Sequence, residues 1–400
     1  LFCEGTTTMK KYYPYLITVS HMINDSCQSV LPALLPLFIY TYGLSLEQAG
    51  FLILANTALS SLLQPLLGYL SDKINQPRLI ALGVLLSACS TGVMGFVTSY
   101  ESLLVCATLA GVGSSIFHPE GAKIMNRLGG GKKGKAMGTF AIGGSSGFAI
   151  GPLFAGSIAY TVGPHGLAAF TVVGLIISTI LFILMPRIVA HARTIDQAVA
   201  TENPTLVDKP LKNYWKYFGI LFVIILSQSV NFRVINAFIP IFWTRELGTS
   251  PEQGSFALTI FFSIGIFMTY IGGLLGDKYG PIKIIRLSLL IWLPAMFLLT
   301  EVPAFSPVIM MPVAYLLLLM IGAAKAISYS PVIVLGQTYL AKSIGFASGI
   351  TLGVSQTIGG IIAPVVGNLA DTYTLPAAMM TLVPFLVVGL GASLILKDPK

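Results

Sequence analysis

Long apolar runs separated by short polar connections dominate this chain of 400 residues. A helix needs about 20 mostly apolar residues to cross roughly 30 Å of hydrocarbon. The runs lack strict alternation and far exceed the roughly 10 residues of a barrel strand. The pattern therefore predicts an all-α membrane protein with twelve transmembrane helices. They are expected at residues 13–40, 47–70, 78–98, 102–126, 136–159, 165–187, 214–243, 252–275, 282–300, 308–338, 347–370 and 376–396. The first, fourth, seventh and tenth are long, which predicts tilt or kinks.

The composition excludes several protein classes. Only 10% of the residues are charged, against roughly 25% in soluble chains, and 55% are hydrophobic. The four cysteines are scattered and fit neither a disulfide scaffold nor metal-ligand spacing. The net charge of +8 would suit nucleic acid, but most basic residues lie in or beside short connections. We therefore expect a lipid-embedded chain with no nucleic-acid partner, no cofactor and no bound metal.

The basic residues also predict orientation and domains. All but three of the 23 lysines and arginines lie on one side of the predicted membrane. They are at the termini, in the connections between spans 2–3, 4–5, 6–7, 8–9 and 10–11, or in the span ends beside those connections. Positively charged connections stay in the cytoplasm, so both termini and the middle connection are expected there. The polar segment 191–212 is expected to be a flexible or partly helical linker between six-helix bundles at 9–190 and 213–400. Residues 1–8 precede Met9 and are interpreted as an expression-vector remnant.

The two predicted bundles carry an internal repeat. GYLSDK at residues 68–73 recurs as GLLGDK at residues 273–278, an offset of 205. Pro152 in the fifth span likewise corresponds to Pro364 in the eleventh, at an offset of 212. Such repeats predict pseudo-symmetric halves around an axis along the membrane normal, with the substrate site between them.

These features resemble the major facilitator superfamily. The resemblance rests on the two six-helix halves, the charged middle connection and the loop signature between spans 2 and 3. That signature comprises Gly68, Leu70, Ser71, Asp72, Lys73 and Arg78, and it is echoed by Asp277 and Lys278 in the second half. The resemblance implies transport by alternating access, with the signature residues involved in gating. A solvated tight turn is the alternative interpretation of either copy alone.

A second motif lies in the fifth span. Gly147, Gly151 and Pro152 resemble the G-x-x-x-G-P element of antiporters in this superfamily, although Ala155 stands where that pattern has glycine. Together with Pro364 in the eleventh span, these residues are expected to allow bending and sliding of helices. Close helix packing alone explains the same small residues equally well.

A narrower resemblance rests on two elements of the first half. His21, Asn24 and Asp25 form a His-x-x-Asn-Asp element, and residues 111–120 read GVGSSIFHPE, with His118 and Glu120 near the end. Both elements resemble the fosmidomycin-resistance branch of the superfamily, whose members are proton-driven drug exporters. The resemblance implies a monomeric antiporter of the bacterial cytoplasmic membrane that exports small molecules, anionic ones included.

Ionisable residues inside predicted spans are the candidate coupling groups, because a charge at membrane depth is costly. Asp25 is the expected proton carrier, and His21 lies one helical turn away on the same face. Glu120 and His118 are further candidates for proton coupling. The alternatives are an Asp25 permanently paired with a cation, a Glu120 in an interfacial ion pair, and a His118 that is simply buried and hydrogen-bonded.

Two cations in the second half are the candidate anion-binding groups, Arg233 in span 7 and Lys325 in span 10. We expect a proton on an acid of the first half to release one of these cations, which then binds an anionic substrate. Neutral contacts to the substrate are expected from Asn24, Gln28, Gln228, Asn231 and Tyr329. Single polar residues in spans also serve as interhelical hydrogen bonds, which is the competing interpretation.

The sequence therefore predicts a proton-coupled secondary transporter that exports small molecules. An uptake symporter for an organic anion would use the same cations and is the main alternative. A membrane-embedded enzyme is disfavoured because no catalytic triad motif, metal-spaced cluster or nucleotide-binding loop is evident. A sensor without transport is a third possibility, although no soluble signalling domain is evident.

Overall fold

The structure is a computed structural model that describes residues 10–74, 76–130, 133–202, 212–342, 347 and 350–397. The described residues form α-helices with short 3₁₀ and π segments. The first half contains α2 (Tyr13–Ala33), α3 (Leu35–Tyr42), α4 (Leu46–Ile74), α5 (Leu79–Val93), α6 (Tyr100–Gly129), α7 (Lys133–Thr161), η2 (Pro164–Leu167) and α8 (Ala168–Glu202). The second half contains α9 (Trp215–Arg245), α10 (Pro251–Tyr279), α11 (Pro281–Glu301), η3 (Val302–Ala304), α12 (Pro307–Ile327), α13 (Tyr329–Tyr339), η4 (Ile350–Val354), α15 (Ser355–Thr372), α16 (Leu375–Met380) and α17 (Val383–Ile395).

The predicted kinks and caps have local causes. The first span is bent by 47° between α2 and α3, where Pro32 and Pro36 flank Leu34. The tenth span is interrupted at Ser328 between α12 and α13. A capping box of Ser250 and Gln253 begins α10. The predicted fourth and seventh spans, by contrast, are the continuous helices α6 and α9.

By length and apolarity, nine described helices can cross a membrane, and ten if α2 and α3 count as one bent span. The remaining two predicted spans are α5, with 15 residues, and α15, with 18. Together these segments form two six-helix halves, so the predicted architecture is confirmed. Large apolar side chains such as Val308 and Tyr270 are exposed on the surface, as expected for groups that face lipid.

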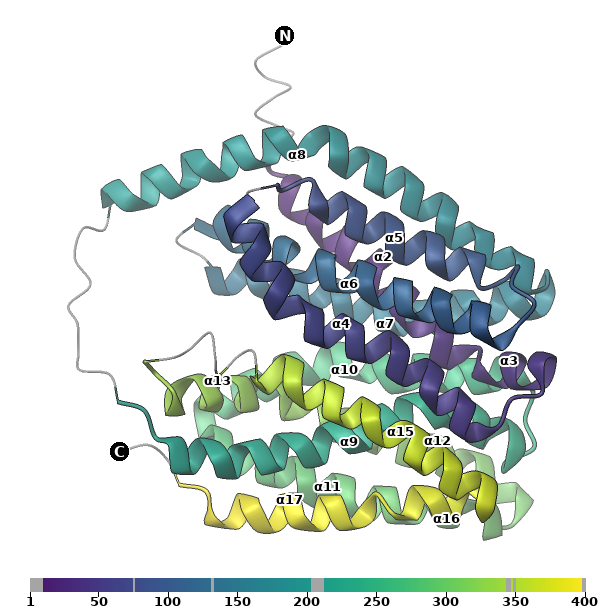
Figure 1. Cartoon of the computed structure of the whole chain (residues 1–400). Helices are drawn as coiled ribbons and strands as arrows, with labels where there is room; N and C mark the ends of the chain where they lie inside the picture. Colours follow the sequence, from purple (N-terminus) through teal and green to yellow (C-terminus); the bar gives the residue numbers. More distant parts are fainter. Residues whose placement is uncertain are drawn as a thin grey trace.

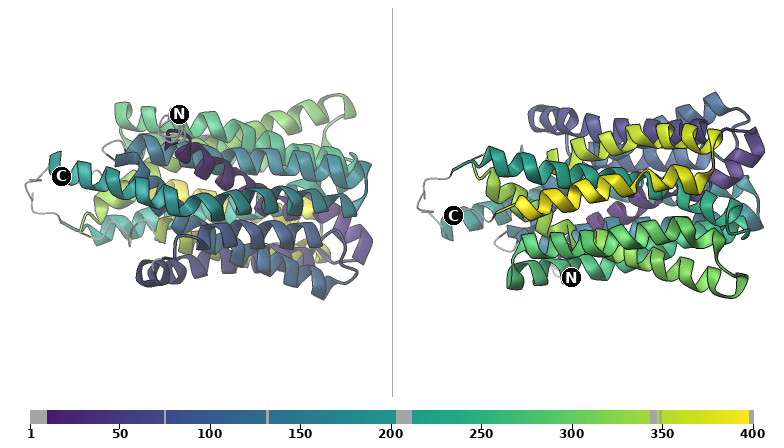
Figure 2. Two further views of the ribbon diagram at one scale, coloured as in Figure 1. Left: turned by 90° about the horizontal axis from the view of Figure 1, so that it is seen from above. Right: turned by 90° about the horizontal axis from the view of Figure 1, so that it is seen from below.

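The two halves lie side by side, with α8 and α17 on opposite outer faces (Figure 1). Helix α4 packs against α15, and α7 packs against α10. Views turned by 90° show the helices of both halves running along the same long direction (Figure 2).

One end of the structure, which we call the linker end, gathers several chain segments. The Tyr214 N–H, just before α9, donates to the Tyr339 carbonyl, and the Tyr339 hydroxyl donates to the Lys397 carbonyl, each at 2.6 Å. The ring of Tyr13 at the start of α2 contacts the ring of His191 on α8, with centroids 5.9 Å apart. The described ends of the chain therefore lie on the side of the linker, and we call the opposite side the far end.

At the far end the halves are joined directly. The Asp371 carboxylate at the end of α15 accepts from the backbone N–H groups of Leu46 and Glu47, both at 2.9 Å, in the first turn of α4. A Cβ on Gly50 would lie 2.5 Å from the Pro364 Cα, so glycine is needed where α4 and α15 cross.

One sequence prediction requires correction. The predicted loop signature at residues 68–73 is helical, because α4 continues to Ile74, and residues 273–278 likewise lie within α10. The side chains of Gly68, Asp72 and Lys73, and all of residues 1–8, lie outside what the structure describes. Helix α8 continues to Glu202, so the first part of the segment 191–212, which was predicted to be a flexible or partly helical linker, is helical.

Candidate functional site

Three ionisable side chains of the first half meet in a cluster that we call the His–Asp triad. Asp25 and His21 come from α2 and His118 comes from α6. His21 Nε2 lies 3.2 Å from Asp25 Oδ2, and His118 Nε2 lies 3.3 Å from Asp25 Oδ1. The two Nε2 atoms are 3.3 Å apart. The sequence predicted the His21–Asp25 pair from its i, i+4 spacing, and the structure adds His118 from 97 residues along the chain.

The opposite ring nitrogens determine which atoms carry protons. His21 Nδ1 lies 2.7 Å from the Phe140 carbonyl, and His118 Nδ1 lies 2.9 Å from the Ser114 carbonyl. The Phe140 carbonyl only accepts, so His21 Nδ1 donates to it, and a neutral His21 then presents an Nε2 lone pair toward Asp25 Oδ2. His118 Nδ1 faces both the Ser114 carbonyl and, at 3.1 Å, the Ser114 hydroxyl, which can donate, so either tautomer of His118 fits its surroundings. The contact between His21 Nε2 and Asp25 Oδ2 is repulsive unless the triad binds a cation.

Neighbouring groups hold the triad in place and seal it. Asn24 Nδ2 donates to Asp25 Oδ1 at 3.0 Å, and Asn24 Oδ1 accepts from the Ser87 hydroxyl of α5 at 3.1 Å. The Phe140 ring of α7 stacks on His21 with centroids 4.0 Å apart. A Cβ on Gly144 would lie 2.7 Å from Asp25 Oδ2, so glycine lets α7 cover the carboxylate.

The triad is suited to a small cation held by the two imidazoles and the carboxylate. Its three potential ligand atoms all lie within 4.8 Å of one another. In spacing and residue type, these are also atoms that a metal ion uses. A proton suits the site as well, because one added N–H on Nε2 turns a repulsive contact into a charge-assisted hydrogen bond.

Glu120 is placed differently. It lies on α6 with a side chain only 3% exposed, and it is outside the set of three clustered ligand atoms. The structure therefore does not bring Glu120 into the His–Asp triad, and its part in proton coupling stays a prediction.

The cations of the second half lack the acidic partners that were considered. Arg233 Nε donates to Gln356 Oε1 at 2.8 Å, and its Nη1 lies 3.5 Å from the Thr57 hydroxyl of α4. Lys325 Nζ lies between aromatic rings, 4.7 Å from the centroid of Phe232 and 4.8 Å from that of Tyr329. Within the described part of the chain, neither cation has a carboxylate within 4.0 Å.

An Asp25 paired with Arg233 or Lys325 is therefore wrong, because two histidines and Asn24 contact its carboxylate oxygens. The proposed release of a cation by protonation of Asp25 fails for the same reason. Among the described residues, both cations already lack a carboxylate partner.

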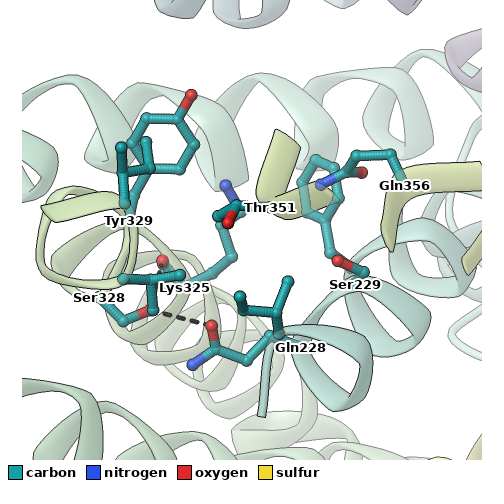
Figure 3. Close-up of a pocket in the computed structure, with 11 residues that line it drawn as sticks. Gln228, Ser229, Lys325, Ser328, Tyr329, Thr351 and Gln356 are labelled. Carbon is teal, nitrogen blue, oxygen red and sulfur yellow. Dashed lines mark hydrogen bonds between the residues drawn. The ribbon is translucent and has the colours of Figure 1, made fainter. Parts of the chain in front are cut away.

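A small cavity of about 40 Å³ adjoins Lys325. Gln228 and Ser328 are hydrogen-bonded at 3.3 Å along its wall, and Gln356 and Tyr329 lie on opposite sides (Figure 3). The residues that line it all come from the second half, whereas a site between the halves was expected. Arg233 does not line it but is hydrogen-bonded to Gln356 and lies beside the ring of Phe232, both of which line it.

Two predicted substrate contacts instead join helices within a half. Gln28 Nε2 donates to the Ala110 carbonyl of α6 at 2.9 Å. Asn231 Nδ2 donates to the Leu382 carbonyl at 3.2 Å and is fully buried. Sequence reasoning missed Gln356 and Ser328, since polar residues of this kind carry no local signal of a site.

The predicted gating residues have these surroundings. Gly147 and Gly151 on α7 pack against α2. A Cβ on Gly147 would lie 2.3 Å from the Met22 carbonyl oxygen, and a Cβ on Gly151 would overlap the Ser29 hydroxyl oxygen. Pro152 lies within α7. Arg78, Asp277 and Lys278 are exposed, with Arg78 over the ring of Phe182.

Comparisons with known proteins agree with this architecture. Residues 17–364 match the Major Facilitator Superfamily. The chain is 31% identical to an uncharacterized MFS-type transporter, YfnC, of Bacillus subtilis, over 99% of this chain and 95% of that protein. It is 29% identical to the fosmidomycin resistance protein of Escherichia coli, over 89% and 85% of the two chains.

Solved structures show the same fold. An inward-facing, occupied bacterial homolog of the human lysosomal transporter Spinster superposes with a TM-score of 0.76 at 17% identity, covering 96% of each chain. A D-xylose-proton symporter gives a TM-score of 0.75 at 15% identity, also over 96% of each. The match across most of its length and the two six-helix halves establish that this chain belongs to the Major Facilitator Superfamily and is a membrane transporter rather than an enzyme.

Proposed function

We propose that the chain is a proton-coupled transporter of the bacterial cytoplasmic membrane that exports small anionic molecules in exchange for protons. The observation that carries this proposal is the His–Asp triad. The Nε2 lone pair of a neutral His21 faces the buried Asp25 carboxylate, and a bound cation makes that contact favourable. In a transporter that cycles between two states, a proton is the cation that such a site would load and release.

His118 is the proposed entry point for the proton. Its side chain is 27% exposed, whereas those of His21 and Asp25 are 8% and 6% exposed. A proton that reaches His118 Nε2 is 3.3 Å from Asp25 Oδ1 and from His21 Nε2, so it can be shared without a further carrier. Histidine changes charge between about pH 5 and 8, which suits coupling to a physiological gradient.

Substrate binding is assigned to the second half. Arg233 and Lys325 supply positive charge without a described carboxylate partner, and Gln228 Nε2 is buried without an acceptor. A cavity of about 40 Å³ has room for about three waters, the size of a carboxylate or phosphonate group. The fosmidomycin resistance protein, a relative at 29% identity, supports a phosphonate drug as one candidate substrate.

Helix α7 connects the two events in this proposal. It covers the triad through Gly144 and Phe140, and it packs against α10 of the other half. Rocking of the halves would change the contact between α7 and α10, and α7 would pass this change to the triad that it covers within its own half. In this proposal the basic residues place the linker end in the cytoplasm. The far end, where α4 and α15 are joined, then lies on the outer side of the membrane, so the structure corresponds to an inward-facing state.

An uptake symporter is the second candidate, and one observation favours it. Because the described surroundings of Arg233 and Lys325 contain no acid, a proton on the triad adds positive charge and attracts an anion. Electrostatics alone therefore favours simultaneous binding of the proton and the anion, as in a symporter. An exporter requires instead that the protein binds the proton in one conformation and the anion in the other.

Flux measurements on proteoliposomes separate these functions. Labelled fosmidomycin, other phosphonates, organic acids and a cationic drug would be tested with acid buffer outside. The proposal predicts accelerated efflux of at least one anion. Accelerated influx would instead establish the symporter, and flux that ignores the pH gradient would refute proton coupling.

Substitution of the cations tests the substrate class. Lys325→Ala and Arg233→Ala each remove one charge–anion interaction and are expected to weaken anion binding by about tenfold or more. Lys342→Ala, an exposed lysine at the linker end, is the matched control. Unchanged binding in both cavity variants would favour a neutral or cationic substrate.

A further inference from the structure

A second concavity lies at the linker end of the first half, far from the His–Asp triad in sequence. It has a volume of about 280 Å³ between the segment before α5 and the later turns of α8. The residues that line it are Gln76, Pro77, Arg78, Pro186, Val189, Ala190 and Arg193. It therefore combines two guanidinium groups with an otherwise neutral wall.

The positive charge of the two arginines is not compensated within the concavity, because none of the described residues that line it carries a carboxylate. Asp196 lies one turn beyond Arg193 on α8, but its carboxylate accepts from Arg127 Nε at 2.8 Å. Within the described residues, the Arg78 side chain contacts the ring of Phe182, with its guanidinium carbon 4.8 Å from the centroid. Two arginines are thus available for an anion from outside the protein, and arginine binds phosphate in a bidentate manner.

The surface beside the concavity is apolar and faces lipid. Phe182 and Ile183 on α8 are 52% and 61% exposed, and Leu82 on α5, one turn from Arg78, is 49% exposed. Arg78 stands at the first turn of α5, where the apolar helix begins. A cationic pocket therefore lies directly above an exposed hydrocarbon-like wall, at the depth where phospholipid headgroups lie.

We propose that this concavity binds the phosphate headgroup of an anionic phospholipid, with Arg78 and Arg193 on the phosphate and the acyl chains along Phe182 and Leu82. The lipid would hold the segment before α5 against α8. This inference concerns a separate site and does not depend on the direction or the substrate of transport.

Native mass spectrometry of the delipidated chain with added phosphatidylglycerol or phosphatidylcholine tests the proposal. We expect preferential retention of phosphatidylglycerol by the wild type. Arg78→Gln and Arg193→Gln should each weaken it about fivefold, and the double variant about thirtyfold. Arg187→Gln, which changes another exposed arginine on the same helix that does not line the concavity, should leave binding unchanged.

Three results would overturn the proposal. An equal loss in Arg187→Gln would mean that general surface charge attracts the lipid, and equal retention of phosphatidylcholine would exclude headgroup recognition. Displacement of the lipid by millimolar inorganic phosphate would establish a site for free anions instead. Arg193→Gln alters only an exposed position on a helix, so its result stands even if Arg78→Gln fails to fold.

Discussion

The His–Asp triad illustrates how much of a site a sequence specifies at the scale of single residues. The i, i+4 spacing of His21 and Asp25 within an apolar run predicted a shared face and a functional role. It could not reveal that His118 completes the cluster, because that contact depends on how α6 packs against α2. Nor could it assign the tautomer of His21, which follows from the Phe140 carbonyl.

Replacement of His118 tests the proposed entry point. In His118→Gln the exposed imidazole is lost and Asp25 Oδ1 loses a partner, so gradient-driven transport should fall about tenfold or more. The remaining activity should also lose the part of its pH dependence that this imidazole supplies. His165→Gln, at an exposed position of the far end, is the control. A wild-type pH profile in His118→Gln would argue against the assignment.

At the scale of the helix, glycines decide which surfaces can meet. The spacing of Gly147 and Gly151 predicted close packing, and the structure identifies α2 as the partner. It also shows why Gly144 matters, since α7 covers the triad there. The contact of Asp371 with α4 could not be predicted, because it joins residues 325 positions apart and an aspartate at a helix end has no distinctive local pattern.

Gly144→Ala should damage the triad. Its Cβ would lie 2.7 Å from both Asp25 Oδ2 and His21 Cε1, and overpacking of this kind costs about 1–3 kcal/mol. We expect lower thermal stability in detergent and a loss of gradient-driven transport. Gly138→Ala, on the same helix with nothing within 4 Å, should be neutral or slightly stabilising. Equal behaviour of the two variants would contradict the close approach of α7.

Asp371→Asn should loosen the far end. Both carboxylate oxygens accept backbone N–H groups of α4, but an amide has one acceptor oxygen, so Asp371→Asn loses one hydrogen bond. Such a loss costs about 1 kcal/mol, so the state in which the far end is closed should lose roughly fivefold in population. Spin-label distances between α4 and α15 would measure the shift. Asp277→Asn, an exposed aspartate near the end of α10, is the control. An unchanged distance distribution would mean that the cap does not hold the halves together.

At the scale of the whole molecule, symmetric halves carry different chemistry. The repeat and the apolar runs predicted both halves, because the length of an apolar run and the offset between repeats can be read from the sequence without knowing any contact. The cavity beside Lys325 belongs to the second half alone, because α12 breaks at Ser328 and turns Tyr329 toward it. The proton and anion sites are therefore assigned to opposite halves, which makes their coupling a property of the interface.

Orientation in the membrane can be tested with single cysteines in a cysteine-free background. Val162 is 75% exposed just before α8, and Lys342 lies at the linker end, where its N–H donates to Asn213. Helix α8, with 35 residues, is about 52 Å long and separates the two ends. Val162→Cys should react with an impermeant maleimide in intact cells, and Lys342→Cys only after permeabilisation. The opposite pattern would reverse the proposed topology.

Flux through Asp25→Asn is the most direct test of the central claim, that the His–Asp triad carries the coupling proton. The amide preserves shape but removes the charge that holds a proton between His21 and His118. Transport driven by a pH gradient across proteoliposomes should be lost, by about a hundredfold or more, while exchange of labelled for unlabelled substrate continues. Driven transport at the wild-type rate in Asp25→Asn would contradict the account.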